Sequence, residues 1–178
     1  PIMSEEITQM LGMRVKQLAP LLSLVVVDAN ANLVQAAISD NKGGYLKIKS
    51  INVADREYFR THASASDLTP ASLFVGRPIQ GRINKVWFIP VSRPRLNADG
   101  SFAGVILGTI KLESFGNLYS SFELPTNASF ALARNDGKFL ARTPFNKLFF
   151  ERTFEDNPFF RDVLPNAGEG IYHEHSSI

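Results

Sequence analysis

The chain of 178 residues contains no cysteine. This absence excludes disulfide-stapled scaffolds, cysteine-ligated zinc, iron–sulfur clusters and cysteine nucleophiles, and it does not fix the redox compartment. The net charge is also small: the chain has 19 Lys and Arg residues and 17 Asp and Glu residues, which gives a formal net charge of +2. So small an excess does not indicate a nucleic acid as the partner.

Long hydrophobic runs are also missing. The longest, residues 18–27, is interrupted by Pro20 and Ser23 and is half the length that a membrane span needs, which is about 20 residues. The first residues show no basic segment followed by an apolar core, so no signal peptide is predicted. The start without an initiator Met and the abrupt end predict that the sequence is a piece of a longer protein.

Motifs typical of enzymes were not found. The sequence has no Gly-x-Ser-x-Gly, no Gly-Lys-Ser/Thr phosphate loop, no His-Glu-x-x-His and no Gly-x-Gly-x-x-Gly. We therefore expect no catalytic residue and no cofactor. His173-Glu174-His175 could place two imidazoles on one face of a strand, but two ligands without a third make a weak metal site. We expect a solvated edge strand there and no metal.

Apolar periodicity and turn residues predict the order of elements. A helix is predicted over residues 2–19 and ends at Pro20. A hairpin follows over residues 22–38, and a short helix over 54–63. Strands are predicted at 72–80, 85–93 and 102–112, the last two joined by a hairpin turn at Asn97–Gly100, and a helix at 114–122. This order predicts an α+β unit on one antiparallel sheet, with one face packed on the long helix and the other free to hold a pocket.

The pattern then restarts. Residues 128–142 predict another hairpin, around Asn135-Asp136-Gly137. The hexapeptide Asp156–Arg161 repeats Asp55–Arg60 as Asp-x-x-aromatic-Phe-Arg. An offset of about a hundred residues is expected for duplicated domains rather than for a solenoid. The sequence thus predicts one complete module and a second module that stops at its third strand.

A basic stretch lies between Asp67 and Asp99, where no acidic residue occurs. A positive field without a local counter-charge attracts anions. On the predicted strand 85–93, Trp87 and Arg93 share one face with alternate apolar residues. The stretch therefore predicts either a pocket floor with an anion hook or an amphipathic strand with solvated charges at its ends. Its basic residues are Arg77, Arg82, Lys85, Arg93 and Arg95.

Several segments, taken in order, resemble the double Cache (PAS-like) extracytoplasmic sensor domain of bacterial membrane receptors. They are Asp55–Arg60, Phe74–Pro78, Trp87–Arg93, Asp99–Val105, and the second hairpin with Ala141–Pro144. The resemblance spans about residues 20–178. It implies an N-terminal stalk helix at 1–19, a membrane-distal, PAS-like ligand-binding module at 20–123 and an incomplete membrane-proximal PAS-like module at 124–178.

The same resemblance implies a periplasmic location, on the outer side of the inner membrane. The full-length protein would be anchored in that membrane and would drive a diguanylate cyclase, histidine kinase or chemoreceptor output inside the cell. Receptors of this type commonly work as dimers, so a homodimer is expected to be possible.

In family members that bind amino acids, the helix after the first hairpin carries Arg-x-aromatic-aromatic-x-Asp. The matching residues are Arg56, Tyr58 and Phe59, but Thr61 stands at the Asp position. A second family Asp, which holds the ligand amine, is replaced by Thr109. Both amine-binding carboxylates are thus missing, whereas Arg56 can still grip a carboxylate through a bidentate fork. The resemblance and its departures together favour an organic acid or another small anion over an amino acid.

The leading interpretation is a ligand-sensing module without catalysis of its own. Arg56 would anchor the anionic group, with Arg77 or Arg93 adding charge. Tyr58 and Trp87 would wall the pocket, although these two and Phe59 are equally good core residues. Thr61 and Thr109 would offer hydroxyls. The alternatives are a structural or dimerisation module with an empty pocket, an enzyme whose site is assembled from scattered residues, and a nucleic-acid-binding surface at residues 77–95.

Overall fold

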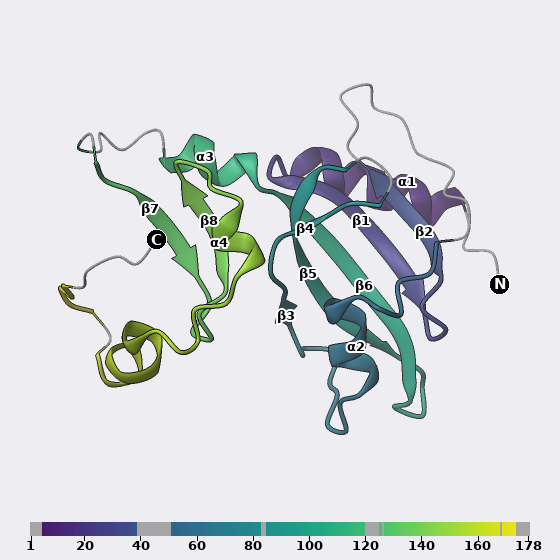
Figure 1. The fold of residues 1–178 in the computed structure, drawn as a ribbon. Coiled ribbons are helices and arrows are strands. Elements are labelled where there is room, and N and C mark those ends of the chain that lie inside the picture. Colours follow the sequence, from purple (N-terminus) through teal and green to yellow (C-terminus); the bar gives the residue numbers. More distant parts are fainter. Residues whose placement is uncertain are drawn as a thin grey trace. The chain divides into compact units, whose positions relative to one another are not determined.

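The computed structural model describes residues 5–38, 51–82, 85–119, 125, 127–167 and 169–173. The chain divides into two compact units, Pro1–Ser114 and Phe115–Ile178. The first unit is built on an antiparallel sheet with strand order β2-β1-β6-β5-β3, in which β4 also pairs with β5 (Figure 1). The chain therefore has a mixed α/β fold with an antiparallel sheet, as expected. The domain boundary predicted at residue 123 remains a prediction, because residues 120–124 lie outside the described part.

Helix α1 runs over Glu5–Gln17 and packs on strands β1 and β2. Its Val15 is 3% exposed, whereas Met10 and Met13 are 50% and 57% exposed. The helix is thus amphipathic, with one apolar residue in the core and others on its surface. The helix ends at Gln17, two residues before the predicted end at residue 19, and residues 2–4 of the predicted range lie outside the described part. Its role as a stalk remains a prediction. In the described residues, no helix is long and apolar enough to cross a membrane.

Strands β1 (Leu21–Asp28) and β2 (Leu33–Ile38) form the predicted hairpin. The Asp28 carboxylate closes the turn, because its Oδ1 accepts hydrogen bonds from the backbone N–H groups of Asn30 at 2.9 Å and Asn32 at 2.8 Å. Strand β1 then pairs with β6 (Phe102–Lys111), which lies far away in the sequence. The two central strands of the sheet thus come from the two ends of this unit.

The predicted strand at 72–80 is wrong in extent. The segment forms two short strands, β3 (Phe74–Val75) and β4 (Ile79–Gln80), both antiparallel to β5 (Trp87–Leu96). Pro78 between them has no N–H to donate to a ladder, which favours an interruption. Strand β5 also begins two residues later than predicted and extends past Arg93 to Leu96.

Gly104 occupies a special position on β6. Its φ is +117°, and a Cβ at this position would lie 2.0 Å from the backbone oxygen of Val27. Only glycine combines this backbone conformation with so close an approach. The residue thus allows β6 and β1 to meet beside the Asp28 turn.

Helix α2 (Glu57–Ala63) packs on β5, β6 and β3 and begins three residues later than predicted. Its Tyr58 and Phe59 are 4% and 6% exposed and belong to one hydrophobic core with strands β1 and β6. The core on this face of the sheet includes Val25, Val27, Val105 and Leu107. Burial of each such side chain stabilises the fold by about 1.5–3 kcal/mol.

The second unit contains helix α3 (Glu113–Tyr119, which begins in the first unit), strands β7 (Phe130–Ala133) and β8 (Phe139–Thr143), helix α4 (Leu148–Glu151) and two short helical turns at Phe159–Val163 and Leu164–Asn166. The hairpin β7–β8 lies where a second hairpin was predicted. Phe139 packs edge-on against Phe149, Phe154 and Phe160. An aromatic cluster therefore holds the unit together. The interpretation of this unit as an incomplete module remains a prediction.

Candidate functional site

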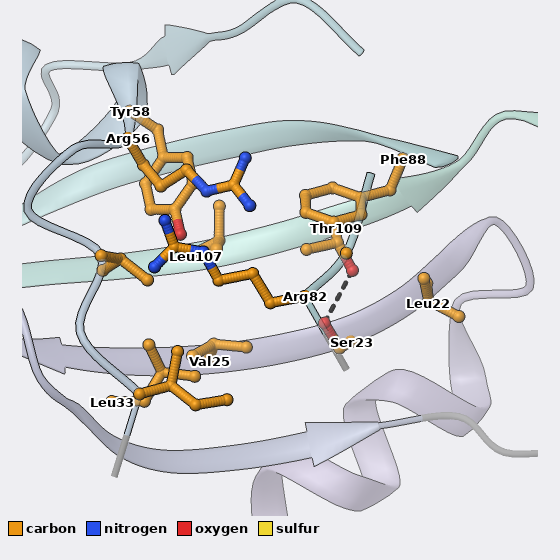
Figure 2. Close-up of a pocket in the computed structure, with 13 residues that line it drawn as sticks. Leu22, Ser23, Val25, Leu33, Arg56, Tyr58, Arg82, Phe88, Leu107 and Thr109 are labelled. Carbon is orange, nitrogen blue, oxygen red and sulfur yellow. Dashed lines mark hydrogen bonds between the residues drawn. The ribbon is translucent and has the colours of Figure 1, made fainter. Parts of the chain in front are cut away.

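A cavity of about 90 Å³ lies on the face of the sheet that helix α2 covers (Figure 2). A cavity needs about 10–15 Å³ to hold a single water, so this one has room for a small molecule. Most of its walls are apolar, and a few polar side chains converge on it, as in ligand pockets generally. It is lined by Leu22, Ser23, Val25, Leu33, Ile51, Val53, Arg56, Tyr58, Gly81, Arg82, Phe88, Leu107 and Thr109.

Arg56 lies at the start of helix α2, as its N-terminal flanking residue with φ −80° and ψ 135°. This extended conformation lets the side chain leave the helix and enter the cavity lining. One guanidinium nitrogen, Nη2, donates a hydrogen bond to the backbone oxygen of Gln80 at 3.3 Å. Because a guanidinium has five N–H donors, most of its donor capacity remains for an anionic ligand.

Arg82 is a second cation at the cavity, and sequence reasoning did not select it as a site residue. Its Nη2 donates to both carboxylate oxygens of Asp55, at 2.7 and 2.6 Å, and its Nη1 donates to the backbone oxygen of Asn52. The Arg82 guanidinium thereby lowers the pKa of the Asp55 carboxyl below its ordinary value. The basic stretch of the sequence contained Arg82, but nothing in the sequence separated it from Arg77.

Tyr58 brings a phenol to the cavity from the first turn of α2 (Figure 2). Burial raises the pKa of its hydroxyl to about 12, and the nearby guanidinium groups of Arg56 and Arg82 oppose this shift. The hydroxyl is therefore a neutral donor at physiological pH. Among the described residues, the structure gives this hydroxyl no hydrogen-bond partner. It is thus available to a ligand beside the two arginines.

A pair of hydroxyls lies farther along the cavity. Ser23 on β1 and Thr109 on β6 stand directly opposite each other in the ladder, and their side-chain oxygens are 2.7 Å apart. They are 5% and 4% exposed. Sequence reasoning selected Thr109 but missed Ser23, because its place opposite Thr109 depends on a pairing between distant strands.

The structure therefore brings together Arg56, Tyr58 and Thr109 of the predicted site residues. Phe59 lies in the core, where it packs edge-on against Phe102 at 5.6 Å. Thr61 on α2 and Arg77 between β3 and β4 are exposed and do not line the cavity.

Trp87 and Arg93 on β5 share one face of the sheet, as the alternation predicted. The cavity, however, is lined by Phe88, and successive side chains of a strand point to opposite faces. Trp87 and Arg93 therefore lie on the face away from the cavity. The sequence predicted Trp87 as the aromatic wall on this strand, whereas the structure has the next residue, Phe88, in that place.

The charges at the cavity have one sign. Among its described lining residues, Arg56 and Arg82 are basic and none is acidic. Water is partly excluded there, so an anion gains from both guanidinium groups, whereas an ammonium group would lose hydration without gaining a counter-charge. In the part of the chain that the structure describes, no group of three or more His, Cys, Asp or Glu residues could hold a metal ion.

Solved structures share the fold of this chain. The extracellular domain of rpHK1S-Z16, a protein described as a histidine kinase, is 30% identical with a TM-score of 0.78, over 95% of this chain and 65% of that one. The ligand-binding domain of the Pseudomonas fluorescens chemoreceptor CtaA, in complex with L-serine, is 14% identical with a TM-score of 0.58, over 84% of this chain and 59% of that one. A domain of a Vibrio parahaemolyticus protein described as sensory box/GGDEF is 14% identical with a TM-score of 0.62, over 97% and 68%.

The chain thus has a fold similar to that of Cache-type extracellular sensor domains found in histidine kinases, chemoreceptors and GGDEF proteins. Residues 112–178 match the family model dCache_1_like, a histidine kinase sensor domain. This match confirms the resemblance to double Cache sensor domains. No curated protein sequence matches the chain. The chain spans 65% and 59% of the first two structures above.

Proposed function

We propose that this chain is the ligand-sensing part of a membrane signalling receptor and that its cavity binds a small carboxylate or other small anion. The observation that carries the proposal is the cavity lining: Arg56 and Arg82 are basic, none of the described lining residues is acidic, and the Asp55 carboxylate that pairs with Arg82 lies outside the lining. A carboxylate at Arg56 would accept two parallel N–H bonds from the guanidinium, and Tyr58 would donate a third bond. Binding would shift the receptor between two states by favouring the one in which the cavity is better formed.

The similar structures support ligand binding and leave the ligand class open. CtaA is described in complexes with L-serine, L-valine and L-alanine, and the Campylobacter jejuni chemoreceptor Tlp3 in complex with L-valine. The described lining of this cavity offers no carboxylate that an ammonium group would need. The proposal therefore places an anion without an amine here, on the periplasmic side of a membrane to which the full-length receptor is anchored. Its output would be a histidine kinase, a diguanylate cyclase or a chemoreceptor signalling domain.

The experiment is isothermal titration of the purified protein with acetate, propionate, butyrate and succinate, and with L-serine, L-alanine and L-valine. We expect at least one carboxylate to bind and Arg56→Ala to weaken its affinity at least tenfold, because a charge-assisted pair contributes about 1.5–3 kcal/mol. The matched control is Arg60→Ala, since Arg60 is exposed on the same helix and does not line the cavity. An affinity for the amino acids alone, or an equal loss in both variants, would contradict the proposal.

A second function has one observation in its favour. Met10 and Met13 of α1 are 50% and 57% exposed and lie three residues apart, on neighbouring positions of the helix surface. This apolar surface suits a dimerisation module. If no carboxylate binds and Met10→Glu with Met13→Glu converts a dimer to a monomer in analytical ultracentrifugation, dimerisation is the better description.

A further inference from the structure

We propose that the hydroxyl pair of Ser23 and Thr109 is a second recognition point of the cavity. It would select a short carboxylate whose far end carries a neutral hydrogen-bonding oxygen, that is, a hydroxy- or oxo-carboxylate. This inference rests on the proposed function, because it takes the anionic end of the ligand to lie at Arg56. It adds a requirement at the opposite end of the same ligand.

The chemistry of the pair suits a neutral oxygen. The two oxygens are 2.7 Å apart, and either can be the donor. One O–H is used between them, which leaves one O–H donor and free lone pairs on both oxygens. The pair can therefore donate to a carbonyl or exchange hydrogen bonds with a hydroxyl. Since the side chains are 5% and 4% exposed, a ligand oxygen at the pair would be largely shielded from bulk water.

The spacing along the sheet separates the two ends of the cavity. Ser23 faces Thr109 and Val25 faces Leu107 in the ladder, so the hydroxyl pair lies two residues farther along both strands than the apolar pair. Two residues of a strand correspond to about 7 Å. Figure 2 shows Tyr58 and Arg56 beside Leu107, with Ser23 and Thr109 farther toward the other end. A ligand that reaches both ends is therefore a short chain with different groups at its two termini.

The walls between the two ends are apolar. Val25 and Leu107 form the floor, and Phe88 and Leu22 lie near the hydroxyl pair. A second carboxylate or an ammonium group at this end would lose its hydration beside apolar side chains and would find only two neutral hydroxyls. A methyl group would fit the walls but would leave the free O–H donor without a partner. A neutral oxygen needs no counter-charge, and it can pair with the free O–H donor.

Three probes of equal size test this inference. Pentanoate, 4-hydroxybutyrate and 4-aminobutyrate each have seven non-hydrogen atoms and differ only in the terminal group, which is a methyl, a hydroxyl or an ammonium. We expect 4-hydroxybutyrate to bind about 3- to 10-fold more tightly than pentanoate, as one neutral hydrogen bond provides, and at least 10-fold more tightly than 4-aminobutyrate. Titration calorimetry of the purified protein measures all three affinities.

The variant Thr109→Val keeps the shape of the side chain and deletes its hydroxyl. Deletion of either hydroxyl alone releases the O–H of the other, so the variant that tests the pair combines Thr109→Val with Ser23→Ala. In this double variant we expect the preference for 4-hydroxybutyrate over pentanoate to fall below about twofold. The matched control is Thr143→Val, on strand β8 and outside the cavity, which should keep the preference. Thermal melting of each variant shows whether it is folded, and the comparison of the three probes on the wild-type protein decides the matter if the double variant does not fold.

The outcomes separate the two proposals. If pentanoate and 4-hydroxybutyrate bind equally, or if the preference survives in the double variant, the inference about the hydroxyl pair is overturned, while an affinity that depends on Arg56 would leave the proposed function standing. Tightest binding of 4-aminobutyrate would overturn the inference as well. If no carboxylate binds to the wild-type protein, the proposed function fails, and the inference fails with it.

Discussion

The guanidinium of Arg82 is bound by both carboxylate oxygens of Asp55, the residue immediately before Arg56. The pair is partly solvated, because the two side chains are 41% and 64% exposed. Asp55 therefore takes up part of the positive charge that the cavity presents. It competes with any anionic ligand for Arg82, although it contributes little to stability as a solvated pair.

We expect Asp55→Asn to strengthen the binding of an anionic ligand about 3- to 10-fold, because removal of the carboxylate frees Arg82. The free energy of unfolding should change by less than about 1 kcal/mol. Titration calorimetry at low and high salt measures the effect, which should shrink at high salt because the pair is exposed. Asp67→Asn, which removes an exposed carboxylate outside the cavity, is the control. Equal gains in both variants would show that only the net charge matters.

Tyr58→Phe should weaken anion binding about 3- to 10-fold and leave the thermal stability nearly unchanged, because the hydroxyl has no partner among the described residues. The pKa of Tyr58 is raised to about 12, so the hydroxyl stays protonated and the affinity of the wild type should not change between pH 7 and 9 on its account. Titrations of both proteins at these pH values check this. A loss of affinity confined to pH 9 in the wild type would show that the phenol ionises there.

His62 on α2 is 2% exposed, and its Nε2 lies 3.0 Å from Oγ of Ser92 on β5. Burial lowers the pKa of this imidazole below its ordinary value of 6.5. As the pH falls below about 6.5, the unfolded chain takes up a proton that the folded chain does not, so the folded state loses stability. The stability of the folded state, as far as it depends on His62, is therefore highest above pH 6.5 and declines on acidification.

We therefore expect the wild type to lose up to about 1.4 kcal/mol more than His62→Asn between pH 7.5 and pH 5.5, by urea unfolding at both values. The variant itself should be less stable at pH 7.5, because it disturbs a buried hydrogen bond between α2 and the sheet. His173→Gln, at an exposed position, should keep the pH dependence of the wild type. An identical pH dependence in His62→Asn and the wild type would contradict the assignment.

Gly104→Ala should destabilise the first unit by at least about 3 kcal/mol, because a Cβ would lie 2.0 Å from the Val27 oxygen at a φ of +117°. Gly100→Ala is the matched control. Its φ is +83°, but a Cβ there has nothing within 4 Å, so only the backbone strain of about 1–2 kcal/mol remains. Chemical unfolding of both variants gives the difference, and losses of equal size would rule out the close contact as the cause.

Local turn chemistry could be predicted from the sequence. The Asp28–Asn32 turn and the Asn97–Gly100 turn both lie between antiparallel strands, as the side-chain types indicated. The interruption of the strand at 72–80 was missed, although Pro78 inside this segment cannot donate to a ladder. The sequence does not show where the two parts pair, and the structure divides the segment into β3 and β4, which both pair with β5.

For the site, too, residues that are close in the sequence could be predicted, and residues brought in by distant strands could not. Arg56 and Tyr58 are close in the sequence and were predicted together. Ser23 reaches the cavity through a pairing with a strand 86 residues away, and no local pattern reveals that register. Arg82 and Arg77 are alike in sequence context, and the path of the chain after β4 decides which one reaches the cavity.

The hydroxyl pair lies close to the points where the chain leaves the sheet. Ser23 is near the start of β1, which begins at Leu21 after helix α1. Thr109 is near the end of β6, which ends at Lys111 and is followed by α3. The backbone N–H of Lys111 donates to the backbone oxygen of Pro20 at 2.9 Å, so a hydrogen bond connects the start of β1 with the end of β6. A molecule that pushed the two hydroxyls apart would strain this hydrogen bond. Binding in a small cavity would then displace the segments that lead to α1 and to α3.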